Sequence, residues 1–124
     1  MPKKVLVCDD ELHILESVSY VIREEGYSVI TAEDGETGLQ LARQELPNLV
    51  LLDIMMPGKD GFEVCRELKS DPETHGVYVI LLTAMGQESD MEEGRRSGAD
   101  EYMTKPYAPR MLRRRLHELL DSYT

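Results

Sequence analysis

The stretch NLVLLDIMMPGKDG, residues 48 to 61, places a single acid directly after an apolar run. Leu49 to Leu52 are apolar without alternation, which is typical of a strand that is covered on both faces of a sheet. Asp53 follows at once, and Pro57-Gly58 then gives a turn signal. A lone Asp at such a place most often initiates a turn. The rest of the chain favours a different reading of this carboxylate.

Strand-like and helix-like runs alternate along the whole chain. We expect strands at 4–8, 28–32, 49–52, 77–82 and 99–103, with helices at 11–25, 34–46, from Asp60 onward, 88–96 and 110–120. Asp34 and the Asp60–Glu63 spacing provide helix N-caps, and Gly98 suits a helix C-cap. Five strand–helix units in a row predict an α/β fold with one doubly wound, five-stranded parallel sheet.

Composition indicates one globular domain and excludes several function classes. The chain has 124 residues, 41% of them hydrophobic, and a net charge of −10. Direct nucleic-acid binding and docking on anionic membranes are disfavoured, because both need a basic surface. No apolar run reaches the length of a membrane span, and the amino terminus does not read as a signal peptide. We therefore expect a cytoplasmic protein.

Cysteines and histidines offer no metal or disulfide pattern. Cys8 and Cys65 are too few and too far apart for a disulfide framework or a CxxC site, and we expect both to be buried thiols. His13, His75 and His117 share no ligand spacing and are interpreted as ordinary surface or rim residues. The chemistry must come from other side chains.

Polar residues follow four of the five expected strands. Asp9-Asp10 follows the first strand, and Asp53 follows the third. The carboxyl ends of strands in a doubly wound sheet meet at one edge, so these acids should form a carboxylate cluster. Each close pair of such charges costs about 4 kcal/mol at 4 Å for an effective dielectric constant near 20. Hard oxygen ligands without His or Cys indicate a bound Mg²⁺.

The fourth and fifth strands add two groups that suit a phosphoryl ligand. Thr83 supplies a hydroxyl donor and Lys105 a mobile positive charge, and both fit phosphoryl oxygens. A carboxylate can act as the nucleophile by forming an aspartyl phosphate. Asp53 stands alone at its strand end with a long loop after it. We therefore predict that Asp53 is a phosphoacceptor.

These motifs together resemble the receiver domains of bacterial two-component response regulators, chemotaxis receivers among them. The motifs are Asp9-Asp10, LLDIMMPGKDG around Asp53, LLTA with Thr83, and Lys105-Pro106. The resemblance covers essentially the whole chain, so residues 1–124 are expected to form one receiver domain. It also implies the flavodoxin-like strand order 2-1-3-4-5.

The resemblance implies a role for each site residue. The Mg²⁺ ligands would be Asp9, Asp10, Asp53 and the backbone carbonyl of Met55. Asp53 would accept phosphate from a phosphohistidine, and Thr83 and Lys105 would hold the phosphoryl group. The Lys105–Pro106 bond is expected to be cis. Tyr107 stands where Phe is commoner in the family, which is a mild departure.

The implied function is a phosphorylation-dependent signalling switch. A sensor histidine kinase or a histidine phosphotransfer protein would donate the phosphoryl group, and a downstream effector domain or protein would respond. Thr83 would move toward the phosphoryl group and vacate space that Tyr102, at the family's aromatic switch position, could fill. The fourth helix, fifth strand and fifth helix would form the output surface, and the first helix is the expected kinase-docking face. Dimerisation on phosphorylation is common in the family.

Three other functions were weighed against the switch. A Mg²⁺-dependent aspartyl-phosphate phosphatase usually carries a second acid two residues after its nucleophile, where this chain has Met55. A flavodoxin-like mononucleotide binder needs a Ser/Thr/Gly-rich loop after the first strand, where Asp9-Asp10-Glu11 would repel phosphate. A phosphate-independent binding receiver would lack site residues, and none is missing here. We expect a signalling domain that assists its own phosphorylation and slow dephosphorylation, and no enzyme.

Overall fold

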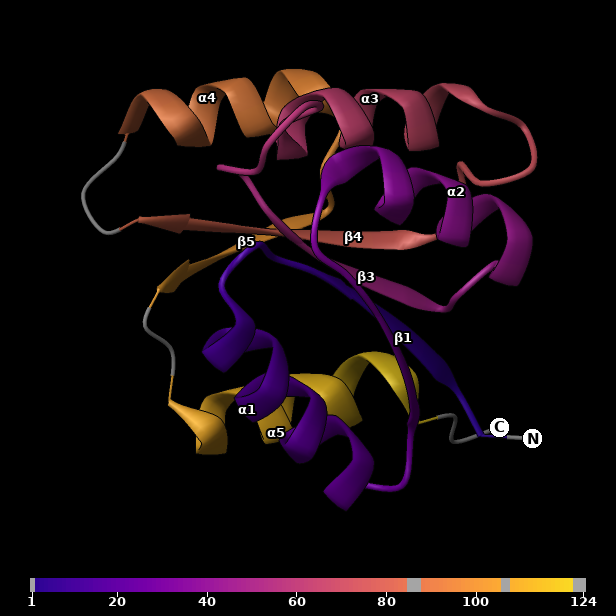
Figure 1. Cartoon of the computed structure of the whole chain (residues 1–124), viewed down its shortest axis with the longest axis vertical. Coiled ribbons are helices and arrows are strands. Elements are labelled where there is room, and N and C mark those ends of the chain that lie inside the picture. Colours follow the sequence, from indigo (N-terminus) through magenta and orange to yellow (C-terminus); the bar gives the residue numbers. More distant parts are fainter. Residues whose placement is uncertain (1, 85–87, 106–107, 122–124) are drawn as a thin grey trace.

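The computed structural model describes residues 2–84, 88–105 and 108–121, and within these ranges five strands alternate with five helices (Figure 1). The strands are β1 Lys4–Cys8, β2 Ser28–Ala32, β3 Leu49–Asp53, β4 Tyr78–Ala84 and β5 Glu101–Lys105. The helices are α1 Leu12–Glu24, α2 Gly35–Glu45, α3 Gly61–Ser70, α4 Glu88–Ser97 and α5 Pro109–Leu120. The predicted alternation of strands and helices is confirmed.

The five strands form one parallel sheet in the order β2-β1-β3-β4-β5. This confirms the doubly wound fold and the strand order 2-1-3-4-5. Helices α2, α3 and α4 cover one face of the sheet, and α1 and α5 cover the other (Figure 1). The chain leaves β1 toward β2 and returns to β3 on the opposite side of β1. The crevice outside the carboxyl ends of β1 and β3 is therefore the switch point at which such sheets bind ligands.

The sheet separates two apolar clusters, because successive strand residues point to opposite faces. Leu6 and Leu52 belong to the cluster beneath α2 and α3, together with Leu68 of α3. Their neighbours Val7 and Leu51 belong to the cluster beneath α1 and α5. Strands that are buried on both faces explain why the apolar runs do not alternate with polar residues.

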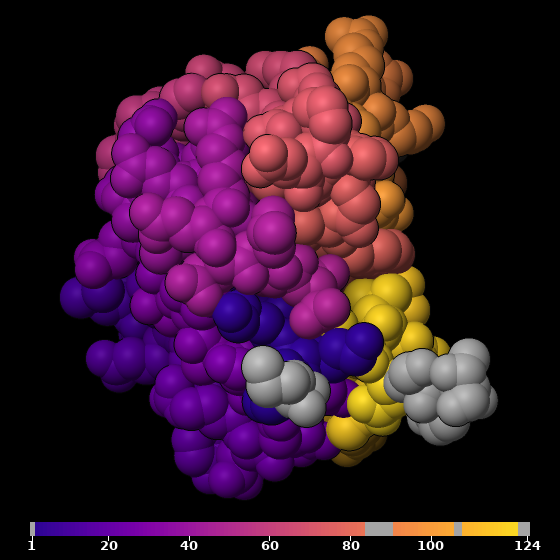
Figure 2. All heavy atoms as spheres, turned by 90° about the vertical axis from the view of Figure 1, so that its right-hand side faces the viewer, coloured from indigo at the N-terminus to yellow at the C-terminus, as the bar shows by residue number. Residues whose placement is uncertain are grey.

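Helix α4 is attached differently from the other helices. Of its side chains that the structure describes, residues 91–97, only Gly94 and Ser97 are buried, and Met91 is exposed. The orange segment that begins with α4 projects beyond the neighbouring surface (Figure 2). Polar contacts hold it to α3: Arg66 Nη1 donates to Glu93 Oε1 at 2.7 Å, and Cys65 Sγ donates to the Ser97 carbonyl at 3.5 Å.

The fifth strand begins two residues later than predicted, at 101 instead of 99. Gly98, with φ +89°, ends α4, and the Ala99 N–H still donates to the Gly94 carbonyl. The Asp100 carboxylate accepts from the Val79 N–H at 2.8 Å and from Lys69 Nζ at 2.7 Å. Residues 99 and 100 thus close a helix and cap a strand. Lys105 consequently lies within β5 and not after it.

The two cysteines are buried and unpaired, as predicted. Burial is the main cause that raises the pKa of the Cys8 thiol to about 12, so this thiol stays protonated. His117 lies at the rim, as expected, but it makes more contacts than an ordinary surface or rim residue. Its Nε2 lies 2.6 Å from Glu25 Oε1 and its Nδ1 lies 2.7 Å from Asp121 Oδ2, while the Tyr27 hydroxyl donates to Asp121 Oδ1 at 2.6 Å.

Within the described ranges, every helix is too short or too polar to cross a bilayer.

Candidate functional site

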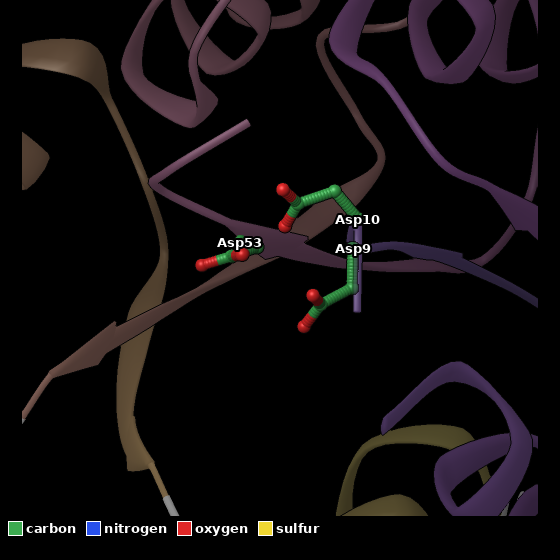
Figure 3. A group of neighbouring side chains, drawn as sticks. All are labelled: Asp9, Asp10 and Asp53. Carbon is green, nitrogen blue, oxygen red and sulfur yellow. The ribbon is translucent and has the colours of Figure 1, made fainter. Parts of the chain in front are cut away.

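Three carboxylates meet at the carboxyl ends of β1 and β3. Cys8 and Leu52 are neighbours in the parallel register, so the residues that follow them lie side by side. Asp9, Asp10 and Asp53 each place a carboxylate oxygen within 4.8 Å of the others (Figure 3). Asp9 is 0% exposed and Asp53 is 5% exposed, whereas Asp10 is open to solvent. The predicted carboxylate cluster is present in the structure.

Lys105, the last residue of β5, reaches across to the two buried acids. Its Nζ lies 2.7 Å from Asp9 Oδ2 and 3.3 Å from Asp53 Oδ2. Glu11 is more distant, with Oε1 3.8 Å from the same nitrogen. One ammonium group therefore balances two buried carboxylates, and an excess of negative charge remains at the edge of the sheet.

This excess of negative charge affects the pKa values of Asp53 and Lys105. Burial, followed by repulsion from Asp9, raises the pKa of Asp53 to about 6, and Lys105 opposes both effects. Burial would lower the pKa of the Lys105 ammonium, but its contacts with Asp9 and Asp53 outweigh this and raise the pKa. The lysine is thus firmly cationic, and the Asp53 charge is only partly compensated.

The donor set of the cluster fits a hard divalent cation. All three groups are carboxylates, and oxygen ligands of this kind suit Mg²⁺ or Ca²⁺. His and Cys, the ligands that softer transition metals prefer, are absent from the group of Asp9, Asp10 and Asp53. A divalent charge would also offset the negative excess that Lys105 leaves. The residues present therefore match the metal that the sequence predicted.

The segment after Asp53 folds back over the strand end. The Ile54 N–H donates to the Leu82 carbonyl at 3.2 Å, and the Gly61 N–H donates to the Ile54 carbonyl at 2.9 Å. Asp60 and Glu63 form the predicted capping box at the start of α3. A Cβ on Gly61 would lie 2.4 Å from the Asp53 carbonyl oxygen, so only glycine allows this approach.

Met55, two residues after Asp53, points its side chain into solvent. Its side chain is 77% exposed, whereas Ile54 and Met56 on either side are buried. The Met55 N–H donates weakly to Asp53 Oδ1, at 3.4 Å. The backbone of residue 55 therefore lies beside the Asp53 carboxylate, and the metal-ligand role of its carbonyl stays a prediction.

Thr83 and Tyr102 lie on the face of the sheet that α4 covers. Leu81 of β4 is the register partner of Tyr102 of β5, and both contact the cluster beneath α2 and α3. Strand alternation puts Thr83 on the same face, two residues beyond Leu81. Thr83 is buried. The Tyr102 hydroxyl is buried without a hydrogen-bond partner among the described residues.

The structure thus brings four predicted residues into direct proximity: Asp9, Asp10, Asp53 and Lys105. Thr83 is the penultimate residue of β4, and Tyr102 is the second residue of β5, three residues before Lys105. Their switch roles stay predictions. Pro106, with the expected cis bond, and Tyr107 lie outside the described residues.

Sequence reasoning missed Gly61 and Gly94, which make close backbone approaches to Asp53 and Tyr102. The capping-box spacing pointed to the helix start beside Gly61. For Gly94 there was no local signal, since its neighbour comes from another strand.

Comparison with known proteins finds similarity to response regulators over nearly the whole chain. Residues 5–117 match the family model described as "Response regulator receiver domain". The chain is 43% identical over 120 residues to the alkaline phosphatase synthesis transcriptional regulatory protein PhoP of Bacillus subtilis, covering 97% of this chain and 49% of PhoP. It is 43% identical over 119 residues to the response regulator PleD of Caulobacter vibrioides, covering 96% of this chain and 26% of PleD. The chain spans about half of PhoP and about a quarter of PleD.

Solved structures agree in fold. A putative response regulator from Chloroflexus aurantiacus superposes with a TM-score of 0.91 at 33% identity, covering 98% of this chain and all of that one. The chemotaxis response regulator CheY4 of Vibrio cholerae gives 0.90 at 29% identity, over 97% of this chain and all of that one. Receiver domains are the signalling domains of two-component systems. With its fold, its acidic edge and these relatives in agreement, this chain belongs to the response regulator receiver domain family.

Proposed function

We propose that residues 1–124 act as one receiver domain whose signalling state changes when Asp53 is phosphorylated. The observation that supports this most directly is the placement of the Asp53 carboxylate: it is buried beside Asp9 and lies 3.3 Å from the Lys105 ammonium. A carboxylate held among opposing charges at the switch point of a doubly wound sheet is suited to accept a phosphoryl group.

The donor is a phosphohistidine of a sensor histidine kinase or a histidine phosphotransfer protein. An Asp53 carboxylate oxygen attacks the phosphorus and the P–N bond breaks. The bonding electron pair goes to the ring nitrogen, and the donor leaves as neutral imidazole because its other ring nitrogen already carries a proton. Lys105 draws the phosphoryl oxygens toward the end of β5, and the Thr83 hydroxyl donates a hydrogen bond to them. No further group of the chain has to change its covalent state.

Asp9, Asp10 and Asp53, with the Met55 carbonyl, would hold Mg²⁺. The chemistry that Mg²⁺ would supply there is charge compensation, both for the carboxylates and for the charge that develops on the transferring phosphoryl group. Lys105, whose Nζ lies 2.7 Å from Asp9 Oδ2, is the chain's own cation for the phosphoryl oxygens. Asp10 is the exposed member of the three carboxylates.

The phosphoryl group adds charge and strong acceptor oxygens at the edge of the sheet. Thr83 and Tyr102 lie on the α4 face, so a shift of Thr83 toward the phosphoryl group changes the packing beneath α4. The output surface is formed by α4, β5 and α5, and a downstream effector domain or protein reads it. PhoP is named a transcriptional regulatory protein, which is one output of this kind. A phosphorylation-linked dimer would use the same surface.

The test is the intact mass of the protein after incubation with acetyl phosphate, with and without Mg²⁺. We expect one added phosphoryl group on the wild type only when Mg²⁺ is present, and none on Asp53→Asn. Asp34→Asn is the matched control, because Asp34 is a helix N-cap outside the carboxylate cluster and Asn preserves that cap.

No adduct and no release of inorganic phosphate would contradict the proposal and leave a phosphate-independent binding module. Multiple turnovers with rapid phosphate release would favour the aspartyl-phosphate phosphatase instead. Such a phosphatase is disfavoured by Met55, whose exposed apolar side chain stands where these enzymes carry their second acid.

A further inference from the structure

Helix α4 contributes no described side chain to the apolar cluster that it covers. The two buried positions among residues 91–97 are Gly94 and Ser97, and the Ser97 hydroxyl donates back to the Gly94 carbonyl at 2.6 Å. Apolar contact beneath the helix therefore has to come from the sheet. Tyr102 of β5 and Leu81 of β4 supply it at Gly94.

Tyr102 approaches α4 so closely that only glycine fits at position 94 without a shift of the tyrosine ring. A Cβ built on Gly94 would lie 2.5 Å from Tyr102 Cε1, 3.2 Å from Tyr102 Cζ and 3.1 Å from Leu81 Cδ1. The tyrosine ring thus lies directly beneath the helix backbone. Because the ring is the far end of a side chain, it is the part that would move if a methyl group were added.

Two opposing effects act on the ring in this position. Packing beneath α4 removes apolar surface from water, which is favourable. The same packing buries the Tyr102 hydroxyl without a hydrogen-bond partner among the described residues, which is unfavourable. Tyr102 is only partly buried as a residue, and its ring is held less firmly than that of a tyrosine whose hydroxyl is hydrogen-bonded, so a small change in its surroundings can displace it.

We propose that Gly94 is a positioning residue. Because residue 94 has no side chain, the Tyr102 ring can pack directly against the backbone of α4, and a movement of the ring is then transmitted to the helix. Residue 94 thereby decides how α4 responds when the packing around Thr83 changes. The signalling consequence rests on the proposed function of Asp53, whereas the contact between Gly94 and Tyr102 is a property of the unphosphorylated protein.

The first test is a double-mutant cycle on thermal stability with Gly94→Ala, Tyr102→Val and the pair. Alanine normally stabilises a helix interior relative to glycine. We expect Gly94→Ala to lower the unfolding midpoint in the wild type, where the ring blocks the methyl group. In the Tyr102→Val background we expect it to raise the midpoint, because only Leu81 Cδ1, the far end of a side chain at 3.1 Å, remains close. Valine keeps the strand propensity of β5 while removing the ring.

Gly76→Ala is the matched control, because a Cβ on Gly76 meets nothing within 4 Å. It should shift the midpoint equally in both backgrounds. If Gly94→Ala raises stability alike in both backgrounds, the proposal is overturned. If Gly94→Ala alone does not fold, recovery in the double variant supports the contact, and failure of the double variant as well overturns it.

The second test uses 19F NMR of protein labelled with 3-fluorotyrosine, with the Tyr102 signal assigned from its loss in Tyr102→Phe. We expect Gly94→Ala to move that signal and to increase its H₂O/D₂O solvent shift, since the ring leaves its place beneath α4. An unchanged signal and solvent shift would overturn the proposal. This measurement needs no phosphorylation, so it remains decisive even if Asp53 accepts no phosphate.

The signalling consequence is read by amide hydrogen exchange in α4 with and without acetyl phosphate and Mg²⁺. Phosphorylation of the wild type should change protection of α4, and Gly94→Ala should reduce that change severalfold while Asp53 still becomes modified. An equal change in both proteins contradicts the coupling. Absence of an adduct in every protein contradicts the proposed function and leaves the contact to be judged by the other two tests.

Discussion

The negative charge of Asp53 lowers the stability of the folded protein. Burial and Asp9 raise its pKa from 3.8 to about 6, which shows that its ionised form is disfavoured despite Lys105. We expect Asp53→Asn to increase the free energy of unfolding by about 1–3 kcal/mol near neutral pH when divalent ions are chelated. Urea titration in EDTA measures this. Adding Mg²⁺ should stabilise the wild type and have little effect on the variant, and a variant less stable than the wild type in EDTA would argue against the account.

Lys105 has the opposite effect on stability. Removing it leaves Asp9 and Asp53 as two buried acids without their cation. Lys105→Met should lower the free energy of unfolding by about 2–4 kcal/mol in the chelated protein, because an uncompensated buried charge is costly. Lys105→Arg, which keeps the charge, is the control. Mg²⁺ should restore part of the loss, and equal stability of the Met and Arg variants would refute the charge argument.

Single residues of the site were predictable where chemistry and position coincide. Asp9, Asp53 and Lys105 are charged residues at the ends of apolar runs, and a parallel sheet gathers such ends at one edge. Gly94 and His117 were not predictable. The contact of Gly94 depends on how far α4 lies from β5, and His117 meets Glu25, which is 92 residues away in the chain.

At the scale of elements, the start of α3 fixes the backbone beside Asp53. A Cβ on Gly61 would lie 2.4 Å from the Asp53 carbonyl oxygen and 2.8 Å from Ile54 Cα, and these backbone atoms cannot move aside cheaply. Gly61→Ala should therefore destabilise the protein by about 1–3 kcal/mol. It should also reduce the yield of the phosphoryl adduct more than Gly76→Ala does. Chemical denaturation and intact mass check the two effects, and parity with Gly76→Ala would count against the close approach.

The helices and the first four strands were predictable as elements because apolar spacing and caps agreed along the sequence. The fifth strand was displaced by two residues for a definite reason. Ala99 looked like a strand residue, but its N–H closes α4, and the side chain of Asp100 caps the start of β4. Tertiary hydrogen bonds therefore overrode local pattern at that boundary.

At the scale of the whole molecule, His117 joins α5 to α1 and to the chain that leads into β2. Its contacts with Glu25 and then Asp121 raise the pKa of the imidazole, and Tyr27 and His117 lower the pKa of Asp121. A raised pKa of a cationic group contributes stability that is complete below its ordinary value of 6.5 and is lost as pH rises through the folded value. The Asp121 contribution is lost only below its ordinary value of 3.8.

His117→Gln should therefore lower stability most near pH 5.5 and least near pH 9. Because the side chain is 40% exposed, solvent screening limits the difference to about 0.5–1 kcal/mol. Urea titrations at the two pH values measure it. His13→Gln is the control, since that side chain is 79% exposed and only weakly paired. A pH-independent loss in His117→Gln would indicate that packing against Tyr27, and not charge, holds the three segments together.

The sheet divides the interior into two apolar clusters that share no side chain. Substitutions in different clusters should therefore have additive effects on stability, because distant, independent sites do not couple. After gene duplication, this separation allows the two faces of the sheet to change independently. Copies can diverge by substitution within one layer while the packing of the other layer is inherited unchanged.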